Sequence, residues 1–347
     1  MANNSRREEL KATAKETLER LTVVLDKLKT NTQACSSRKY SSRTLPHLDP
    51  NDCPAHPERA TIKVVNEDTL NAAIQLMLID SATEGGNNNN NNNTNTSNAT
   101  SRPAIVNFAN HRHPGGGWQN GAMAQEEAIC YRSSLPLSLN PKHYPLAMDE
   151  ALYSPYVLVV RGDMASGHHL LLDDDDSAAA LGALPVVSVL TVAAIYQPPV
   201  RTFILNKKTK KEEKGKEGKD KDKEKTAGVD AMDVDEQTQL LEEETQQPGR
   251  DKVHVFERDR DRDITKSKMR LALRMAATNG NDLLVLGALG CGVFANPPED
   301  VAHCWLEVLK EHEFRGNWWR QVWFAVYDPK EDGNFEIFDR VLSGKKV

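Results

Sequence analysis

Apolar residues recur at every third or fourth position near the start of the chain. They are Leu10, Ala14, Leu18, Leu21, Leu25 and Leu28. This spacing places all six on one face of a helix, so it predicts an amphipathic helix over residues 6–29. The polar, proline-bearing stretch at 30–60 is predicted to be a wrapping loop.

Short apolar runs alternate with helical patterns over the rest of the chain. Strands are predicted over residues 61–65, 104–109, 156–161, 185–195, 282–286 and 321–327. Helices are predicted over residues 68–78, from about 123, over 264–279, from 297 and over 335–342. Strands that alternate with helices predict an α/β fold, in which helices cover both faces of a sheet.

Two tracts interrupt this alternation. Asparagine dominates residues from about 84 to 101, and lysine and glutamate dominate residues from 207 to about 252. Neither composition can bury enough apolar area to order itself, so both are predicted to be disordered inserts. We expect one large domain, in which residues 1–60 supply a helix and a loop and residues 61–347 form the remainder.

Charge and cysteine content narrow the class of protein. A net charge of −6 and a pI near 6.0 argue against general nucleic-acid affinity, which requires a basic surface. Five scattered cysteines without a Cys-x-x-Cys pair indicate reduced thiols. The first residues lack the apolar core of a signal peptide, and the longest apolar run is too short for a bilayer. We expect a monomer of the cytoplasm or nucleus without membrane contact; the cluster that begins at Lys207 is either a nuclear import signal or a soluble linker.

A strand, a glycine loop and the start of a helix follow one another at residues 104–127. The loop reads Asn107-Phe-Ala-Asn-His-Arg-His-Pro-Gly-Gly-Gly-Trp, and Gln125-Glu126-Glu127 follows shortly after it. Three consecutive glycines let the backbone pass close to a bulky, charged ligand, where a Cβ would collide. A strand-to-helix turn of this kind presents backbone N–H groups to phosphates.

A second glycine loop lies between the strand at 282–286 and the next helix. Gly290 and Gly292 are expected to help form a nest of N–H groups that binds an anion, with Asn296 as the helix N-cap and Pro297 at the first helical position. Residues 290–295 also match the Gly-x-Gly-x-x-Ala dinucleotide fingerprint. The acidic residue that this fingerprint requires about twenty positions later would fall inside a helix, so an NAD-dependent oxidoreductase is disfavoured.

No set of residues has the spacing of a metal site. His111 and His113 have no acidic or cysteine partner at ligand spacing, which favours surface histidines. The acidic run at 173–176 lacks the alternate spacing and the glycine of a calcium loop, so it is expected to be a solvated loop.

The glycine triplet and the Gln-Glu-Glu together resemble the catalytic signature of the microbial-type poly(ADP-ribose) glycohydrolases, a divergent branch of the macrodomains. The resemblance extends to Arg6-Arg-Glu-Glu-Leu, to Val64-Val-Asn-Glu-Asp-Thr-Leu and to residues 285–297. It implies a three-layer α/β/α macrodomain-like fold with a mixed sheet and an extra N-terminal helical segment. It also implies hydrolysis of the ribose–ribose O-glycosidic bond, without a metal or organic cofactor, to release ADP-ribose from poly(ADP-ribose) or ADP-ribosylated proteins.

The resemblance assigns roles to the residues at matching positions. Glu127 would be the catalytic acid and Glu126 would hold ribose hydroxyls; the alternative is two solvated glutamates in a first helical turn. Consecutive helical residues diverge by about 100°, so the two carboxylates cannot flank one bond as in an ordinary glycosidase. Asn107 and Asn110 would contact the distal ribose or cap the turn. Gln125 would orient the acid or the attacking water, or make a loop hydrogen bond.

The two glycine loops would grip one diphosphate from opposite sides, while an aromatic ring packs against the distal ribose. The residues predicted for these contacts are Gly115, Gly116, Gly117, Gly290, Cys291, Gly292, Val293 and Phe294. Asp68 is placed either at the adenine or as a helix cap. After the strand at 185–195 the chain reads Ala194-Ile-Tyr-Gln-Pro, where the family more often has a Pro-Ala-Pro-Asn-like turn, so the contacts of this loop stay open.

Two other functions would use the same pocket. A binding module would recognise terminal ADP-ribose without turnover, although a pure reader has no need of Glu126 and Glu127. A mono-ADP-ribosyl hydrolase would remove a single unit from protein or nucleic acid, and sequence alone does not separate it from the glycohydrolase.

Overall fold

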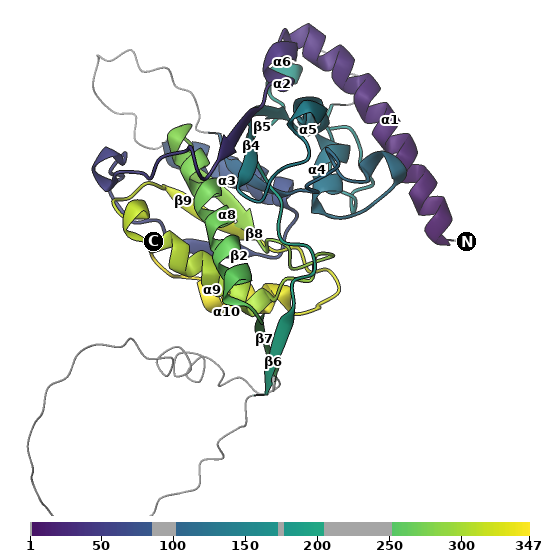
Figure 1. Ribbon diagram of the computed structural model, residues 1–347. Coiled ribbons are helices and arrows are strands. Elements are labelled where there is room, and N and C mark those ends of the chain that lie inside the picture. The colour runs from purple at the N-terminus through teal and green to yellow at the C-terminus, as the bar shows by residue number, and fades with distance from the viewer. Residues whose placement is uncertain (1, 85–101, 173–176, 205–251) are drawn as a thin grey trace, which may run out of the picture.

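The computed structural model describes residues 2–84, 102–172, 177–204 and 252–347 (Figure 1). Nearly all of both predicted inserts, the acidic run at 173–176 and the cluster at Lys207 therefore lie outside the described residues. Within the described ranges, seven strands form one mixed sheet. In spatial order they are β1 (Arg38–Ser41), β4 (Glu150–Leu158), β5 (Val186–Val192), β3 (Ala104–Phe108), β8 (Leu283–Gly287), β9 (Gln321–Ala325) and β2 (Ile62–Val65).

Helices cover both faces of this sheet. One face packs against α8 (Asp259–Thr278), α9 (Pro298–Leu309) and α10 (Asn334–Leu342). The other face packs against α3 (Thr69–Glu84) and α4 (Gln125–Arg132), and α1 (Ala2–Leu28) lies against α4. Short helices α2 (Asn31–Ala34), α5 (Leu135–Ser138) and α6 (Ala178–Gly182) follow the edge of the sheet on the α1 side (Figure 1). This arrangement confirms the predicted three-layer α/β/α fold and its N-terminal helix.

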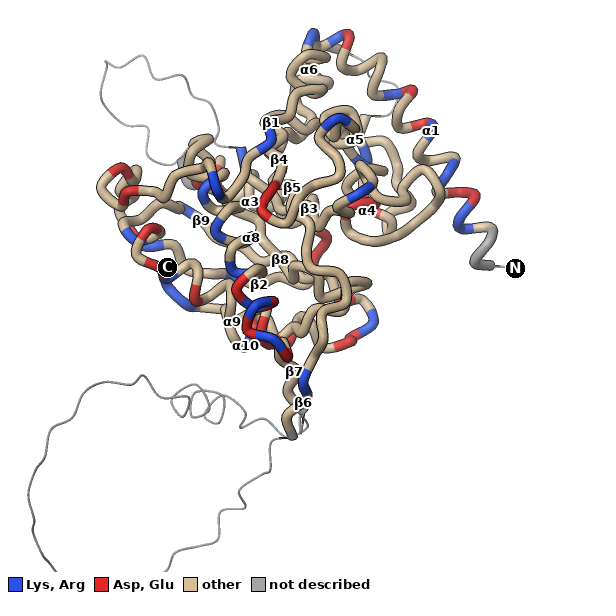
Figure 2. The backbone as a smooth tube through the Cα atoms, viewed as in Figure 1, with Lys and Arg blue, Asp and Glu red and all other residues tan. Residues whose placement is uncertain are grey.

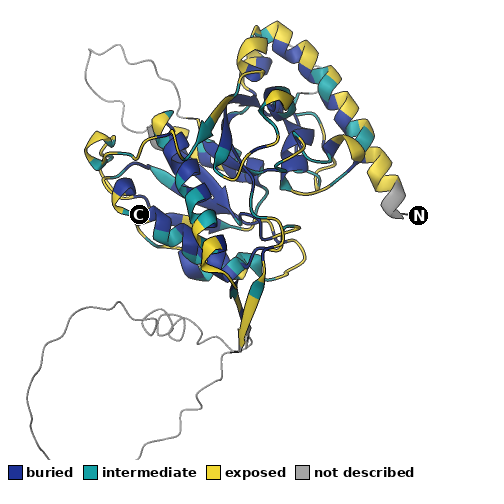
Figure 3. Cartoon of the chain, in the orientation of Figure 1, coloured by how far each residue is buried: buried dark blue, intermediate teal, exposed yellow. Residues whose placement is uncertain are grey.

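Alternating side chains of the central strands supply two separate cores. In β8, Leu284 and Leu286 pack with α8 and α9, whereas Leu283 and Val285 pack with α3 and α4. A parallel strand that is buried on both faces reads as a continuous apolar run, which is why this strand was predictable (Figure 3). β3 pairs in parallel with β5 and with β8, so its carboxyl end lies near the middle of the sheet. The glycine triplet begins beyond that end.

Several strands differ from the prediction. The predicted wrapping loop contains β1, which adds to β4 at the sheet edge. Its exposed, polar sequence carries no strand pattern, because an edge strand needs little apolar surface. β4 begins at Glu150 rather than at 156, because the ladder tolerates Pro155 at an irregularity between Ser154 and Val157. A separate antiparallel ribbon, β6 (Val200–Ile204) with β7 (Lys252–Phe256), projects from the molecule in Figure 1.

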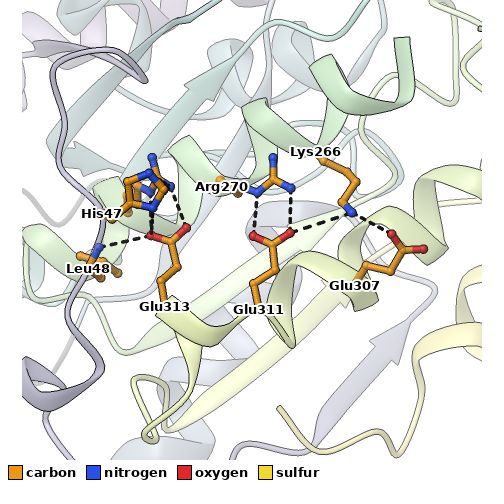
Figure 4. A network of polar contacts seen from close by, with 8 residues as sticks. His47, Leu48, Lys266, Arg270, Glu307, Glu311 and Glu313 are labelled. Atoms are coloured by element: carbon orange, nitrogen blue, oxygen red, sulfur yellow. Dashed lines mark hydrogen bonds and ion pairs between the residues drawn. The ribbon is translucent and has the colours of Figure 1, made fainter. Parts of the chain in front are cut away.

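A row of ion pairs ties α8 to the end of α9 and the turn after it (Figure 4). Arg270 makes a bidentate pair with Glu311 at 2.6 and 2.7 Å, and Lys266 bridges Glu307 and Glu311. Lys266 and Arg270 lie four positions apart, so they share one face of α8. Arg274, one turn later, extends this face.

Glu311→Gln is expected to lower the free energy of unfolding by about 1 kcal/mol at low salt, because it removes the charge that Arg270 and Lys266 share. The loss should shrink at about 1 M salt, where partly exposed ion pairs are screened. Urea unfolding at both salt concentrations measures it, with the exposed Glu257→Gln as the control. Equal losses for Glu311→Gln at low and high salt would show that packing, and not charge, is responsible.

Candidate active site

The residues after β3 form a compact turn that ends against α4. Gly115 and Gly116 have φ values of 72° and 58°, a region that glycine enters without steric penalty. The N–H of Gly116 donates to the carbonyl of His113 at 3.0 Å. Gly117 then leads into a short 3-10 helix, Trp118–Asn120. The following helix, α4, begins at Gln125, close to the predicted start.

The glycine at the middle of the triplet makes room for carboxylates. A Cβ on Gly116 would overlap Oε1 of Glu127 and would lie 3.1 Å from Oε2 of Glu126. The sequence predicted that a Cβ here would collide with a ligand. In the described structure the carboxylates of Glu126 and Glu127 fill the space beside Gly116. The absence of a Cβ therefore lets these two acids approach the backbone.

Glu126 is almost fully buried, at 3% exposure, on the acidic first turn of α4. Figure 2 marks the acidic positions of the chain in red. Its carboxyl accepts hydrogen bonds from the backbone N–H of Asn110 (2.7 Å), the backbone N–H of Gly115 (3.2 Å) and the amide of Asn107 (3.4 Å). Burial raises the pKa of Glu126 to about 8, since it outweighs the three donors, and the charge of Glu127 adds to the rise. Glu126 therefore keeps a proton at neutral pH.

Glu127 is held differently. Its Oε1 accepts one hydrogen bond, from the backbone N–H of Gly117 at 2.8 Å, and its buried Oε2 has no hydrogen-bond partner among the described residues. One oxygen of Glu127 thus has no hydrogen-bond partner among the described residues, whereas both oxygens of Glu126 are engaged.

The two predicted asparagines hold the turn in place. Asn107 is fully buried at the end of β3 and directs its amide to Glu126. Asn110 accepts the backbone N–H groups of Arg112 and His113 at 2.8 and 3.1 Å, which is the predicted turn cap. Contact between either side chain and a ribose stays a prediction.

Gln125 uses its side-chain amide to fix the start of α4. Its oxygen accepts the N–H of Phe108 at 2.8 Å, and its nitrogen donates to the carbonyl of Val106 at 2.7 Å and to Thr69 at 3.0 Å. These are the structural hydrogen bonds of the predicted alternative. Through them Gln125 anchors the helical turn that carries both acids to β3 and α3.

The second glycine loop, after β8, corrects one prediction. Asn296 does not cap α9: its buried amide donates to the carbonyls of Ile195 (2.7 Å) and Gly290 (3.2 Å), Pro297 is the N-cap, and the helix begins at Pro298. Asparagine is a common N-cap because its oxygen can accept helix N–H groups. Here its nitrogen is required inside the loop, so the amide holds the loop closed instead.

A cavity of about 640 Å³ opens between this loop and α4. That volume suits a nucleotide-sized ligand. The predicted contacts that line it are Gln125, Gly290, Cys291, Gly292, Val293 and Phe294. The predicted residues Gly115, Gly116, Gly117, Glu126 and Glu127 are not part of its lining, and they adjoin it at the first turn of α4, where Ala124 and Gln125 face the cavity.

Asp68 satisfies the predicted capping role and also lines the cavity. Its Oδ1 accepts the backbone N–H of Leu70 at 2.8 Å, and it pairs with Arg132, which is 1% exposed. Arg132 in turn donates to Asn71 at 2.7 Å. Sequence reasoning missed Arg132 and Asn71, because Arg132 joins Asp68 and the Asn71 side chain through tertiary packing and belongs to no local motif.

Two absences concern only the described part of the chain. There, no group of three or more His, Cys, Asp or Glu residues is arranged to hold a metal ion. In the same ranges, no helix has the length and apolar character needed to cross a bilayer.

Known proteins that resemble this chain include ones matched over the region that contains the glycine triplet and Gln-Glu-Glu. Residues 11–162 match the model of the microbial-type PARG catalytic domain, and no curated protein matches the chain. Poly(ADP-ribose) glycohydrolase (PARG) from Thermomonospora curvata has 24% identity and a TM-score of 0.61 over 96% of this chain and 100% of that chain. PARG from Deinococcus radiodurans in complex with ADP-ribose has 22% identity and a TM-score of 0.54 over 90% and 95%. Residues 11–162 are thus similar to the microbial-type PARG catalytic domain, the family that the glycine triplet and Gln-Glu-Glu resemble.

Proposed function

We propose that this protein hydrolyses the ribose–ribose O-glycosidic bond of poly(ADP-ribose) and releases ADP-ribose. One observation carries the proposal: two buried, adjacent carboxyls accept N–H groups from a glycine turn beside a nucleotide-sized cavity. The Thermomonospora curvata PARG bound to the inhibitor ADP-HPD has the same fold, with 24% identity and a TM-score of 0.60, and supports a ligand of this size.

The bond cleavage follows from what each acid can do. Glycosidic cleavage passes through an oxocarbenium-like transition state and requires an acid to protonate the leaving oxygen. Glu127 has the free oxygen, so it donates the proton to the leaving ribose oxygen as the bond to the anomeric carbon breaks. Water then adds its hydroxide to that carbon and returns a proton to Glu127. Glu126, fixed by its three donors, holds the ribose hydroxyls.

The second glycine loop is the proposed diphosphate site. Gly290, Gly292 and Val293 line the cavity, and a glycine loop between a strand and a helix can present backbone N–H groups to a phosphate. Phe294 lines the cavity and would pack against the distal ribose. This arrangement would place the anomeric carbon at the first turn of α4.

A reader without turnover is the second candidate. Burying Glu126 until its pKa reaches about 8 disfavours the folded state at neutral pH, and the turn gives both acids defined positions. Such perturbed carboxyls cluster at catalytic sites, whereas recognition of a neutral ribose needs no acid. The site therefore favours an enzyme over a reader.

Turnover is expected to fall as the pH rises above about 8. A carboxyl with a raised pKa keeps its proton up to that pKa, so Glu126 is neutral below about pH 8 and charged above it, where it can no longer donate to a ribose oxygen. The pH profile of kcat/KM on polymer measures this loss. In ¹³C NMR, the carboxyl signal that disappears in Glu126→Gln should titrate in the same range. A rate that stays constant well above pH 8 would show that the protonation of Glu126 does not control turnover.

Product analysis tests the proposed function. The full-length protein is incubated with poly(ADP-ribosyl)ated protein and, separately, with mono(ADP-ribosyl)ated protein. We expect ADP-ribose from the polymer and a single unit left on the acceptor. Release of the single unit alone would make the protein a mono-ADP-ribosyl hydrolase, and binding without release from either substrate would make it a reader.

A further inference from the structure

An exposed tyrosine stands beside the cavity on the β5 side. Tyr196 follows the end of β5 by four residues and has 58% of its surface exposed. Its ring meets Phe294 edge-on, with centroids 5.2 Å apart and an interplanar angle of 84°. Phe294 lines the cavity and Tyr196 does not, so the two rings form an aromatic surface that continues from the cavity wall to the outside.

The backbone on either side of Tyr196 is fixed to the second glycine loop. The N–H of Gln197 donates to the carbonyl of Phe294 at 2.9 Å, and the carbonyl of Ile195 accepts the buried amide of Asn296 at 2.7 Å. Gln197 has a φ of 46°, which a side-chain-bearing residue adopts only where its surroundings impose it. The exposed ring is thus presented from a rigid support, which limits the entropy lost when a ligand stacks on it.

The order of the strands places Tyr196 beyond the two acids. Strands β5, β3, β8, β9 and β2 are adjacent and parallel, so their carboxyl ends share one edge of the sheet. Tyr327 follows β9 and Glu67 follows β2, and both line the cavity. Glu126 and Glu127 lie against the turn that follows β3. A ligand that lies along this edge from β2 to the acids would continue across the cleaved bond toward β5 and Tyr196.

We propose that Tyr196 binds the adenine of the next unit of the polymer, on the leaving-group side of the cleaved bond. This inference rests on the proposed function. The leaving oxygen belongs to the ribose that carries that adenine, so the base lies close to the cleaved bond. Planar bases stack on exposed aromatic rings, and a mono-ADP-ribosylated acceptor has no base at this position. Tyr196 therefore selects polymer over a single unit.

Binding to ADP-ribose and to its dimer tests the subsite. Affinities are measured in full-length Glu127→Gln, so that the dimer is not consumed. Adding Tyr196→Ala should weaken the dimer about tenfold while leaving ADP-ribose within about twofold, and Tyr196→Phe should preserve both affinities. Tyr327→Ala, which removes an exposed tyrosine that lines the cavity, should weaken both ligands by the same factor and serves as the matched control.

Two binding results would overturn the subsite. If Tyr196→Ala leaves the affinity for the dimer unchanged, no base stacks there; if it weakens dimer and monomer equally, Tyr196 only supports Phe294. The proposed function can fail separately. Dimer-selective binding that depends on Tyr196, in a wild type that releases no ADP-ribose, would retain the subsite in a reader. Polymer cleavage with a normal KM in Tyr196→Ala would retain the enzyme and reject the subsite.

Discussion

Glu127→Gln is expected to lower kcat for polymer cleavage by about 10²–10⁴-fold while the affinity for ADP-ribose changes little. The amide can still accept the N–H of Gly117, so the turn stays in place, but it cannot donate an acidic proton to the leaving oxygen. Single-turnover release of ADP-ribose measures the rate, and calorimetry measures the affinity.

Glu126→Gln is the matched comparison, because it makes the same replacement of a carboxyl by an amide at the neighbouring residue. Since Glu126 is assigned to the ribose hydroxyls, its loss should weaken ADP-ribose binding as well as slow cleavage. If Glu127→Gln cleaves at the wild-type rate, Glu127 is not the catalytic acid. If only Glu126→Gln loses cleavage while its affinity for ADP-ribose stays normal, the two roles are exchanged.

Gly116→Ala is expected to lower kcat/KM by at least about 100-fold. Its Cβ would overlap Oε1 of Glu127, and a displacement of about 1 Å at a catalytic group is enough for a loss of that size. The φ of 58° also makes alanine unfavourable, which should lower the free energy of unfolding by about 1–2 kcal/mol. Turnover and urea unfolding are measured on the same preparation.

Gly280→Ala separates the two effects of that substitution. Gly280 has a similar φ of 72°, but a Cβ there would meet nothing within 4 Å, and it lies in the turn after α8. This variant should show the loss of stability without the loss of turnover. If Gly116→Ala behaves like Gly280→Ala, the close approach of the triplet to the acids does not matter for catalysis.

The central sheet and the pair of acids were predictable from sequence for local reasons. β3 and β8 are buried on both faces, so β8 appears as a continuous apolar run and β3 as an apolar run interrupted only by Asn107. Gly116 and Glu127 belong to one continuous motif, and the structure shows that they touch. Because Gly116 and Glu127 are close in the sequence, the motif that contains them predicted both their contact and an acid-catalysed glycosidic cleavage.

Other features depend on contacts between distant segments, which leave no pattern in the sequence. The amide of Asn296 reaches the carbonyl of Ile195, 101 residues away, so a rule for helix caps assigned it wrongly. Arg132 pairs with Asp68 from a separate helix. β1 is short and polar, and only its ladder with β4 makes it a strand.

Release of ADP-ribose from poly(ADP-ribosyl)ated protein, followed by chromatography for the wild type and Glu127→Gln side by side, tests the central claim most directly. The account predicts that ADP-ribose accumulates with the wild type, while the variant binds the polymer and releases at most a small fraction at the same times. A wild type that binds the polymer and releases no ADP-ribose, or a variant that releases it as fast as the wild type, would contradict the account.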